Sequence, residues 1–184
     1  NNISMVADAT HPFAAQISIN AADACKVARI SRLRLLRAEW KKQLGDEWQV
    51  VADIESAAAA LPLAGQRAFL SVGRQEVAAF APLKTMFLLI RSIHPPDDKI
   101  LLPNATFIAG RGPFSVSDEI TLLRDQSIDV LVSKNAGGSA TYAKIAAARK
   151  LGIKVIMIDR PSVPPGAITD SVEGALAWLN TLFG

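Results

Sequence analysis

The segment best suited to bind an anion is SKNAGGSAT, residues 133–141, which follows a short apolar run. A strand that leads through paired glycines into a helix offers unpaired backbone N–H groups and a partial positive charge to a phosphate. Lys134 adds a positive charge, and Ser139 and Thr141 add hydroxyl donors. The segment therefore favours a phosphate site, although its spacing agrees equally well with a tight turn in which the glycines only permit close packing.

Two further loops carry arginines. Gly73 and Arg74 follow another apolar run, and the planar guanidinium of Arg74 is suited to hold a phosphate or a carboxylate. In GRGPF, residues 110–114, two glycines and a proline favour an irregular turn that projects Arg111 and Phe114 together. Such a turn would offer a carboxylate partner beside a flat apolar surface. The alternatives are a surface arginine in the first loop and a core phenylalanine in the second.

The segment DATHPF, residues 8–13, places a carboxylate, a hydroxyl and an imidazole at the end of an expected strand. Open α/β sheets bind ligands at that end. Because an imidazole exchanges its proton near neutral pH, His11 is a candidate proton donor. A helix cap or an ordinary loop residue is the more common role of such a histidine, and Asp8 would then only cap the helix or orient His11.

The composition narrows the classes of function. Half of the 184 residues are hydrophobic and 20% are charged, which predicts a packed core rather than disorder. The formal charge of +3 is scattered and aromatic residues make up 6%, so an anionic small molecule fits better than a nucleic acid. The single cysteine and two histidines argue against a disulfide or a zinc site. We therefore expect no metal. Apolar runs are shorter than the ~20 residues that span a bilayer, so we expect a cytoplasmic protein with no membrane partner.

Short apolar runs alternate with longer alanine-rich patterns of helical period, which is typical of βαβ units. The fold class is therefore predicted as α/β with mainly parallel sheets. Strands are expected at residues 3–7, 33–36, 48–51, 68–72, 86–92, 106–109, 129–132 and 154–158. Helices are expected at residues 12–28, 53–61, 76–83, 117–125, 139–150 and 172–182.

Individual residues predict where these elements begin and end. Pro12 suits the first position of a helix, where its missing N–H costs nothing. Asp53 is a candidate N-cap, and Pro62 is expected to end that helix. The proline, glycine and polar residues of segment 61–67 predict a domain boundary. The predicted domains are residues 1–63 and 64–184.

Six short motifs along the chain match the pattern of one protein family. They are DATHPFA (8–14), LLRAEW (35–40), FLSVGR (69–74), RGPF (111–114), SKNAGG with TYAK (133–144) and IDRP (158–161). In order and spacing, over essentially the whole chain, they resemble the precorrin-6A reductases of cobalamin biosynthesis. Ala38 stands where that family commonly has a proline. The family's N-terminal segment, with a strand and a Gly-Gly-Thr loop, has no counterpart here, and the chain opens at Asn1, so we expect an N-terminal piece of the natural protein to be absent.

The resemblance implies NADPH-dependent reduction of precorrin-6A to precorrin-6B, by hydride transfer to a ring carbon. It also implies two Rossmann-like domains with mainly parallel sheets and a cleft between them. The candidate cofactor-binding residues are Gly73, Arg74, Ser133, Lys134, Asn135, Gly137, Gly138, Ser139 and Thr141. The candidate substrate-binding residues are Arg91, Arg111, Phe114 and Arg160, and the candidate catalytic residues are Asp8 and His11.

Two other classes of function use the same loops. A non-catalytic tetrapyrrole- or nucleotide-binding module would hold a ligand without turnover. A tetrapyrrole cyclase or lyase would bind the carboxylate-rich substrate and need no nicotinamide. Nicotinamide binding and oxidation separate the three, since only the reductase shows both. We expect the protein to act as a monomer on an anionic tetrapyrrole.

Overall fold

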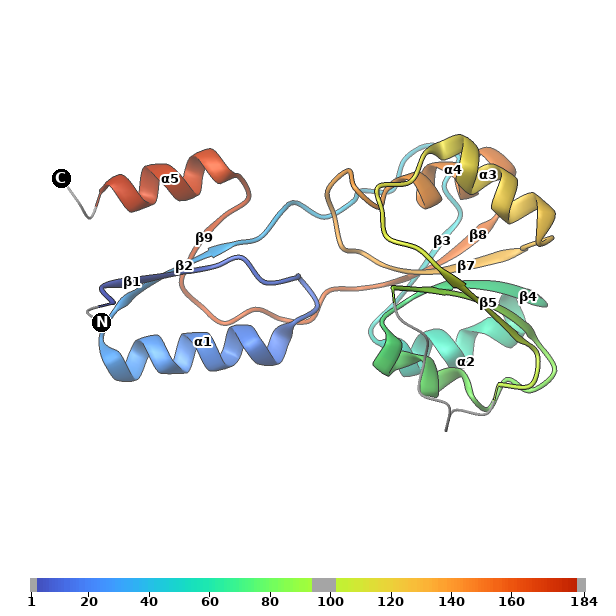
Figure 1. Ribbon diagram of the computed structural model, residues 1–184, viewed down its shortest axis with the longest axis horizontal. Coiled ribbons are helices and arrows are strands. Elements are labelled where there is room, and N and C mark those ends of the chain that lie inside the picture. The colour runs from blue at the N-terminus through green and yellow to red at the C-terminus, as the bar shows by residue number, and fades with distance from the viewer. Residues whose placement is uncertain (1–2, 94–101, 182–184) are drawn as a thin grey trace. The chain divides into compact units, whose positions relative to one another are not determined.

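The computed structural model describes residues 3–93 and 102–181, which fall into two compact units (Figure 1). The small unit comprises Asn1–Glu39 and Arg160–Gly184, and the large unit comprises Trp40–Asp159. Each unit has one sheet, and every strand pairing in both sheets is parallel. The predicted α/β class with parallel sheets is therefore confirmed.

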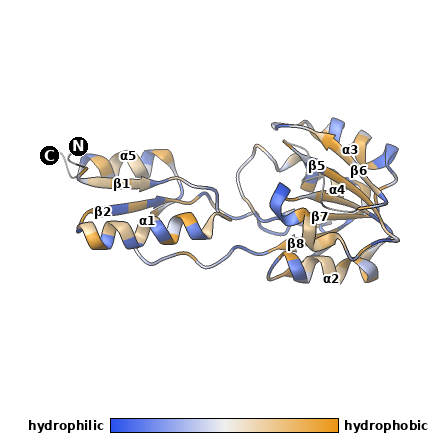
Figure 2. Ribbon diagram, turned by 60° about the horizontal axis from the view of Figure 1, so that its bottom comes forward, coloured by the Kyte–Doolittle hydropathy of each residue, from blue (hydrophilic) through white to orange (hydrophobic). Residues whose placement is uncertain are grey.

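The small unit is a three-stranded sheet with a helix on each side (Figure 2). Its strand order is β1 (Met5–Asp8), β2 (Ser31–Leu35) and β9 (Ala167–Thr169). Its helices are α1 (Ala15–Ala28) and α5 (Val172–Asn180). The register sets Asp8 beside Arg34, so a carboxylate and a guanidinium face one another across neighbouring strands.

The large unit is a six-stranded sheet. Its strand order is β3 (Trp48–Val51), β8 (Lys154–Ile158), β7 (Val130–Lys134), β4 (Arg67–Ser71), β5 (Phe87–Ser92) and β6 (Ala105–Ala109). Its helices are α2 (Ile54–Ala64), a 3-10 helix (Arg74–Phe80), α3 (Val116–Asp125) and α4 (Ala143–Leu151).

The helices of the large unit cover both faces of its sheet, with α3 and α4 on one side and α2 on the other (Figure 1). The core beneath α3 and α4 contains Phe69, Leu89 and Leu131 of the sheet together with Leu123 and Ile145 of the helices. Four of these five side chains are fully buried, and Leu123 is 1% exposed. Burial on both faces explains why the central strands are continuous apolar runs in the sequence.

The observed units differ from the predicted domains 1–63 and 64–184. Strand β3 pairs with β8, setting Trp48 beside Val155, and this pairing brings the segment after residue 39 into the large unit. After β8 the chain returns to the small unit, where β9 pairs with β2. Strand β9 was not predicted, because three residues are too short to show an alternating pattern.

Three predicted helix limits are wrong, and one predicted cap is confirmed. Asp53 is the N-cap of α2, since its carboxylate accepts a hydrogen bond from Ser56 N at 2.8 Å. Helix α1 begins at Ala15 rather than Pro12. Helix α2 runs through Pro62 to Ala64: the proline removes one backbone hydrogen bond and crowds the carbonyl four residues before it, but Leu61 beside it stays fully buried. Helix α4 begins at Ala143, not at residue 139 or 140.

Two more expectations for helices need correction. The segment expected as an α-helix at residues 76–83 is the 3-10 helix, which starts directly after Gly73. The spacing of Phe13, Ile17, Ala21, Ala24 and Ala28 predicts an apolar face for α1, but the helix buries Ser18 and Cys25 while Ile17 is 57% exposed. Among the helices of residues 3–93 and 102–181, none is long and apolar enough to cross a membrane.

Candidate functional site

The large unit has a pocket of about 490 Å³ at the carboxyl edge of its sheet, which we call the arginine pocket. Its position follows from the strand order. From β4 the chain moves outward to β5 and β6, then crosses back to β7 on the other side of β4. Parallel α/β sheets bind ligands at such a reversal of strand order, beside the carboxyl ends of the strands. The lining residues are Ser71, Val72, Gly73, Arg74, Arg91, Ser92, Ile93, Gly110, Arg111, Gly112, Phe114, Ala140, Thr141 and Lys144.

The arginine pocket gathers residues that were predicted for two different ligands. Gly73, Arg74 and Thr141 were assigned to the cofactor, and they line the pocket. The substrate candidates Arg91, Arg111 and Phe114 line the same pocket. The remaining cofactor candidates are not among its lining residues: Ser133, Lys134, Asn135, Gly137, Gly138 and Ser139.

Arg91 is held in the arginine pocket by an ion pair and by stacking on an aromatic ring. Its guanidinium lies 3.8 Å from the centre of the Phe114 ring, and its Nη2 lies 2.7 Å from the carboxylate of Glu119. A Cβ on Gly110 would lie 3.2 Å from both Arg91 and Phe114, so this glycine permits the close stacking. The GRGPF turn therefore presents Phe114 to the pocket with its face covered by Arg91, whereas Arg111 is exposed.

Lys144 is a pocket residue that the sequence analysis did not select. It lies in α4, it is 4% exposed, and its amine donates to the carbonyl of Thr141 at 2.8 Å. Burial lowers the pKa of Lys144 to about 7, the charge of Arg91 acts in the same direction, and the charge of Glu119 opposes both. The available signal was a lysine among the apolar residues of an alanine-rich helix, at positions 143–148.

The SKNAGG segment is held in place by its own side chains. Ser133 and Lys134 are the last residues of β7, and Lys134 forms an ion pair with Glu76. Glu76 also accepts a hydrogen bond from the backbone N–H of Gly73 at 2.7 Å. These contacts connect the loop after β7 to the loop after β4.

Asn135 has a structural role that its sequence context did not reveal. Its side-chain oxygen accepts from the backbone N–H of Trp40 at 2.9 Å, and its amide donates to the carbonyl of Trp40 at 3.2 Å. The indole of Trp40 donates in turn to the carbonyl of Gly138 at 2.7 Å. Asn135 therefore ties the start of the large unit to the glycine loop.

Helix α4 begins several residues after the glycines of this loop, which bears on the predicted phosphate site. Gly137 and Gly138 adopt positive φ angles of 69° and 72°, which glycine accommodates without strain. A turn of four residues then separates them from the helix. The helix dipole therefore does not begin at Ser139 as predicted, although Ser139 and Thr141 are exposed and available to a ligand.

The small unit has a pocket of about 370 Å³, which we call the histidine pocket. Its lining residues are Ala9, Thr10, His11, Pro12, Leu35, Arg37, Asp170 and Val172. They follow the carboxyl ends of β1, β2 and β9, as predicted for His11 from its place after a strand. The imidazole Nδ1 of His11 accepts a hydrogen bond from Phe13 N at 3.2 Å.

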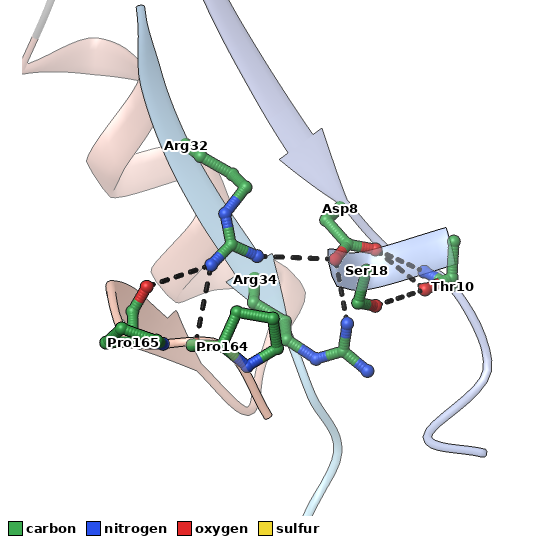
Figure 3. A network of polar contacts seen from close by, with 7 residues as sticks. All are labelled: Asp8, Thr10, Ser18, Arg32, Arg34, Pro164 and Pro165. Atoms are coloured by element: carbon green, nitrogen blue, oxygen red, sulfur yellow. Dashed lines mark hydrogen bonds and ion pairs between the residues drawn. The ribbon is translucent and has the colours of Figure 1, made fainter. Parts of the chain in front are cut away.

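Asp8 lies behind the histidine pocket at the centre of a buried polar network (Figure 3). Its carboxylate pairs with Arg34 at 2.7 Å and with Arg32 at 3.4 Å, and it accepts from the hydroxyl of Thr10 at 2.7 Å. Burial works to raise the pKa of Asp8, but the hydrogen bonds from Thr10 and Ser18 and the charge of Arg34 together lower it. Asp8 thus anchors the turn that carries His11, and Arg32 and Arg34 complete a network that the sequence analysis missed.

Arg160 lies in the small unit, whereas Arg91 and Arg111, the other two arginines predicted for the substrate, lie in the large unit. Its Nη1 donates to the carbonyl of Arg37 at 2.8 Å, and its Nε lies 3.9 Å from the carboxylate of Glu39. The three arginines predicted for the substrate are therefore divided between two regions of the chain.

Comparison with known proteins gives a consistent result. The model of the family "Precorrin-6x reductase CbiJ/CobK" matches residues 1–180. The chain is similar to the precorrin-6A reductase of Rhodococcus erythropolis, with 51% identity over 181 residues, 98% of this chain and 73% of that protein. It is 45% identical to the precorrin-6A reductase of Rhodobacter capsulatus over 177 residues, 96% of this chain and 70% of that protein.

A more distant relative and a solved structure agree with these matches. The cobalt-precorrin-6A reductase of Methanocaldococcus jannaschii is 28% identical over 185 residues, covering 98% of this chain and 74% of that protein. A solved structure of a CobK precorrin-6A reductase matches the fold with a TM-score of 0.92 and 44% identity, over 97% of this chain and 71% of that one.

Proposed function

The chain belongs to the precorrin-6x reductase family CbiJ/CobK, and from this premise we propose that it reduces precorrin-6A to precorrin-6B in cobalamin biosynthesis, with NADPH as hydride donor. The proposal goes beyond family membership in naming the cofactor and the residues that hold each ligand. A monomeric state and a cytoplasmic location stay predictions.

The observation that carries the proposal is the arginine pocket. Three arginines line it, Arg74 at the start of the 3-10 helix, Arg91 on β5 and Arg111 after β6. A substrate with acetate and propionate side chains offers several carboxylates to pair with them. Their combined positive potential attracts an anionic macrocycle into the pocket. The exposed Arg74 and Arg111 are free to turn toward the ligand, while Arg91 and Phe114 give it a fixed flat surface.

The glycine loops support a nucleotide beside this substrate. When bound, NADPH supplies a hydride to a ring carbon of the macrocycle, and the protein positions the two reactants. We assign the cofactor phosphates to the loops after β4 and β7, which the contacts from Glu76 to Gly73 and Lys134 hold together. Arg74, Ser139 and Thr141 are exposed polar residues of these loops. Lys134 contributes a positive charge behind them.

His11 is our candidate for delivering the proton that accompanies hydride transfer to a double bond. It lines the histidine pocket and is oriented by Phe13, on a turn that the buried Asp8 network stabilises. Asp8 acts through this turn as a positioning residue, because its carboxylate is fully occupied by Thr10 and two arginines.

The test of the proposed function is to titrate the chain with NADPH and NADH and then to follow the nicotinamide absorbance after adding precorrin-6A. The reductase proposal predicts binding followed by oxidation. Binding without oxidation would favour a nucleotide-binding module instead. No nicotinamide binding would overturn the proposal and favour a tetrapyrrole cyclase or lyase.

A further inference from the structure

We infer that the amine of Lys144 is a ligand-binding group of the arginine pocket, and that it takes up a proton when an anionic group, phosphate or carboxylate, binds beside it. The inference rests on the proposed function, because the cofactor and the substrate supply such anionic groups. It concerns a residue to which that function assigns no role.

The position of Lys144 supports a direct contact with the ligand. Lys144 lines the pocket from its buried side and is 4% exposed, whereas Arg74 and Arg111 line it from the exposed side. The amine is fixed by its hydrogen bond to Thr141 and lies 5.2 Å from the centre of the Trp40 ring. An amine has three donor hydrogens when it is charged, so these contacts leave donor capacity for a ligand.

The charges around Lys144 explain why its amine is poised to lose or gain a proton. Arg91 on β5 repels a second positive charge, and Glu119 on α3 is already paired with Arg91 at 2.7 Å. Arg74 and Arg111 line the same pocket, and their positive charges cannot serve as counter-charges to the amine. Among the residues that the structure describes, no carboxylate lies within ion-pair distance of Lys144.

An anion in the pocket reverses this balance. A phosphate or carboxylate near the amine favours its charged form and therefore raises the pKa of Lys144 from about 7. By linkage, the same anion binds more tightly when Lys144 is already protonated. The affinity for the anion should therefore be high below pH 7 and fall as the pH rises through the pKa that Lys144 has in the ligand-free protein. Between pH 6 and pH 8 the expected fall is about fivefold for a shift of about one unit and approaches about tenfold for a larger shift.

The direct test is an NMR titration of the lysine side-chain resonances, in which the signal of Lys144 is identified by its loss in Lys144→Met. Titrations are made without ligand, with NADP⁺, and with a porphyrin that carries acetate and propionate groups. Titration near pH 7 in the free protein, followed by a pKa at least about one unit higher with either ligand, supports the inference. The ligand that produces the larger shift identifies whether phosphate or carboxylate lies beside the amine.

Variants extend the test to affinity. Lys144→Met should lose the pH dependence of NADP⁺ or porphyrin binding, and Lys144→Arg should bind without pH dependence because its charge is permanent. Lys150→Met is the matched control, since Lys150 lies on the same helix and is exposed. It should keep both the affinity and the pH dependence of the unmodified protein.

The outcomes separate this inference from the proposed function. If NADP⁺ or the porphyrin binds and the pKa of Lys144 does not move, the inference is wrong and the proposed function stands. If neither ligand binds, the proposed function fails. The same titration with sulfate then tests separately whether an anion in the pocket raises the pKa of Lys144. A pKa raised by sulfate would support the inference, and an unchanged pKa would overturn it.

Discussion

The two pockets lie at the carboxyl edges of two parallel sheets, yet their buried charges are arranged in opposite ways. Behind the histidine pocket, the carboxylate of Asp8 pairs with two arginines, and its charge is satisfied within the protein. In the arginine pocket, the buried Lys144 has a hydrogen bond to a carbonyl, and the nearby carboxylate of Glu119 is paired with Arg91. A buried charge with its own counter-ion therefore stabilises structure, while a buried amine beside exposed cations is suited to bind an anionic ligand.

The largest expected effect is the loss of stability of the small unit in Asp8→Ala. This change leaves Arg34, whose side chain is 1% exposed, without its counter-charge, and breaking a buried pair in this way costs roughly 3–5 kcal/mol. Denaturant unfolding that monitors the small unit measures the loss. Asp23→Ala, an exposed site on α1, is the control and should change stability little. A small loss for Asp8→Ala would mean that the network does not stabilise this unit.

The next effect concerns His11. If His11 delivers a proton, His11→Ala should lower kcat by roughly 10²-fold or more and alter the pH profile of turnover. His11→Asn is the matched control, because an asparagine side-chain oxygen can accept the Phe13 N–H in place of the imidazole Nδ1. Full activity in His11→Asn would show that the residue only shapes the turn.

A smaller effect is expected from Lys134→Ala. Removing a positive charge behind the cofactor loop should raise the KM for NADPH about tenfold, equivalent to about 1.4 kcal/mol of binding free energy. Because Lys134 also pairs with Glu76, the double variant with Glu76→Gln tests whether the effect comes from an uncompensated carboxylate. An unchanged KM in Lys134→Ala would contradict the phosphate assignment.

The smallest expected effect is the pH dependence of the Asp8 network. The pKa of Asp8 is lowered in the folded protein, so its contribution to stability is present above the pKa of the unfolded chain and is lost as the pH falls through the folded pKa. Unfolding of the native protein should therefore become easier in acid below about pH 4. Asp8→Asn should lack this component of the acid dependence, and an identical acid profile would count against the network.

Much of the fold could be predicted because local pattern and tertiary structure agree in the large unit. The apolar runs at β4, β5 and β7 were found because both faces of these strands are buried. The division into units was not found, since β3 joins the large sheet through β8, which is about a hundred residues away in sequence. Pairings of that range leave no local signal.

The candidate site shows the same limit. The loops of Gly73, Arg74 and Arg111 were found from glycine and arginine beside expected strands, and the order of the strands brings them to one pocket. Lys144 was missed because its burial depends on how α4 packs against its neighbours. The roles of Arg32 and Arg34 were missed because their partner Asp8 lies on a different strand, and only the register between β1 and β2 makes them neighbours.

The most direct test of the arginine pocket as the ligand site is amide hydrogen exchange of the chain with and without NADP⁺. Binding at this pocket should slow exchange in residues 71–76, 108–114 and 137–146, which follow β4, β6 and β7. Lys150→Met should show the same pattern as the unmodified protein. Slowed exchange confined to other segments, with these three unchanged, would show that NADP⁺ does not bind at the arginine pocket.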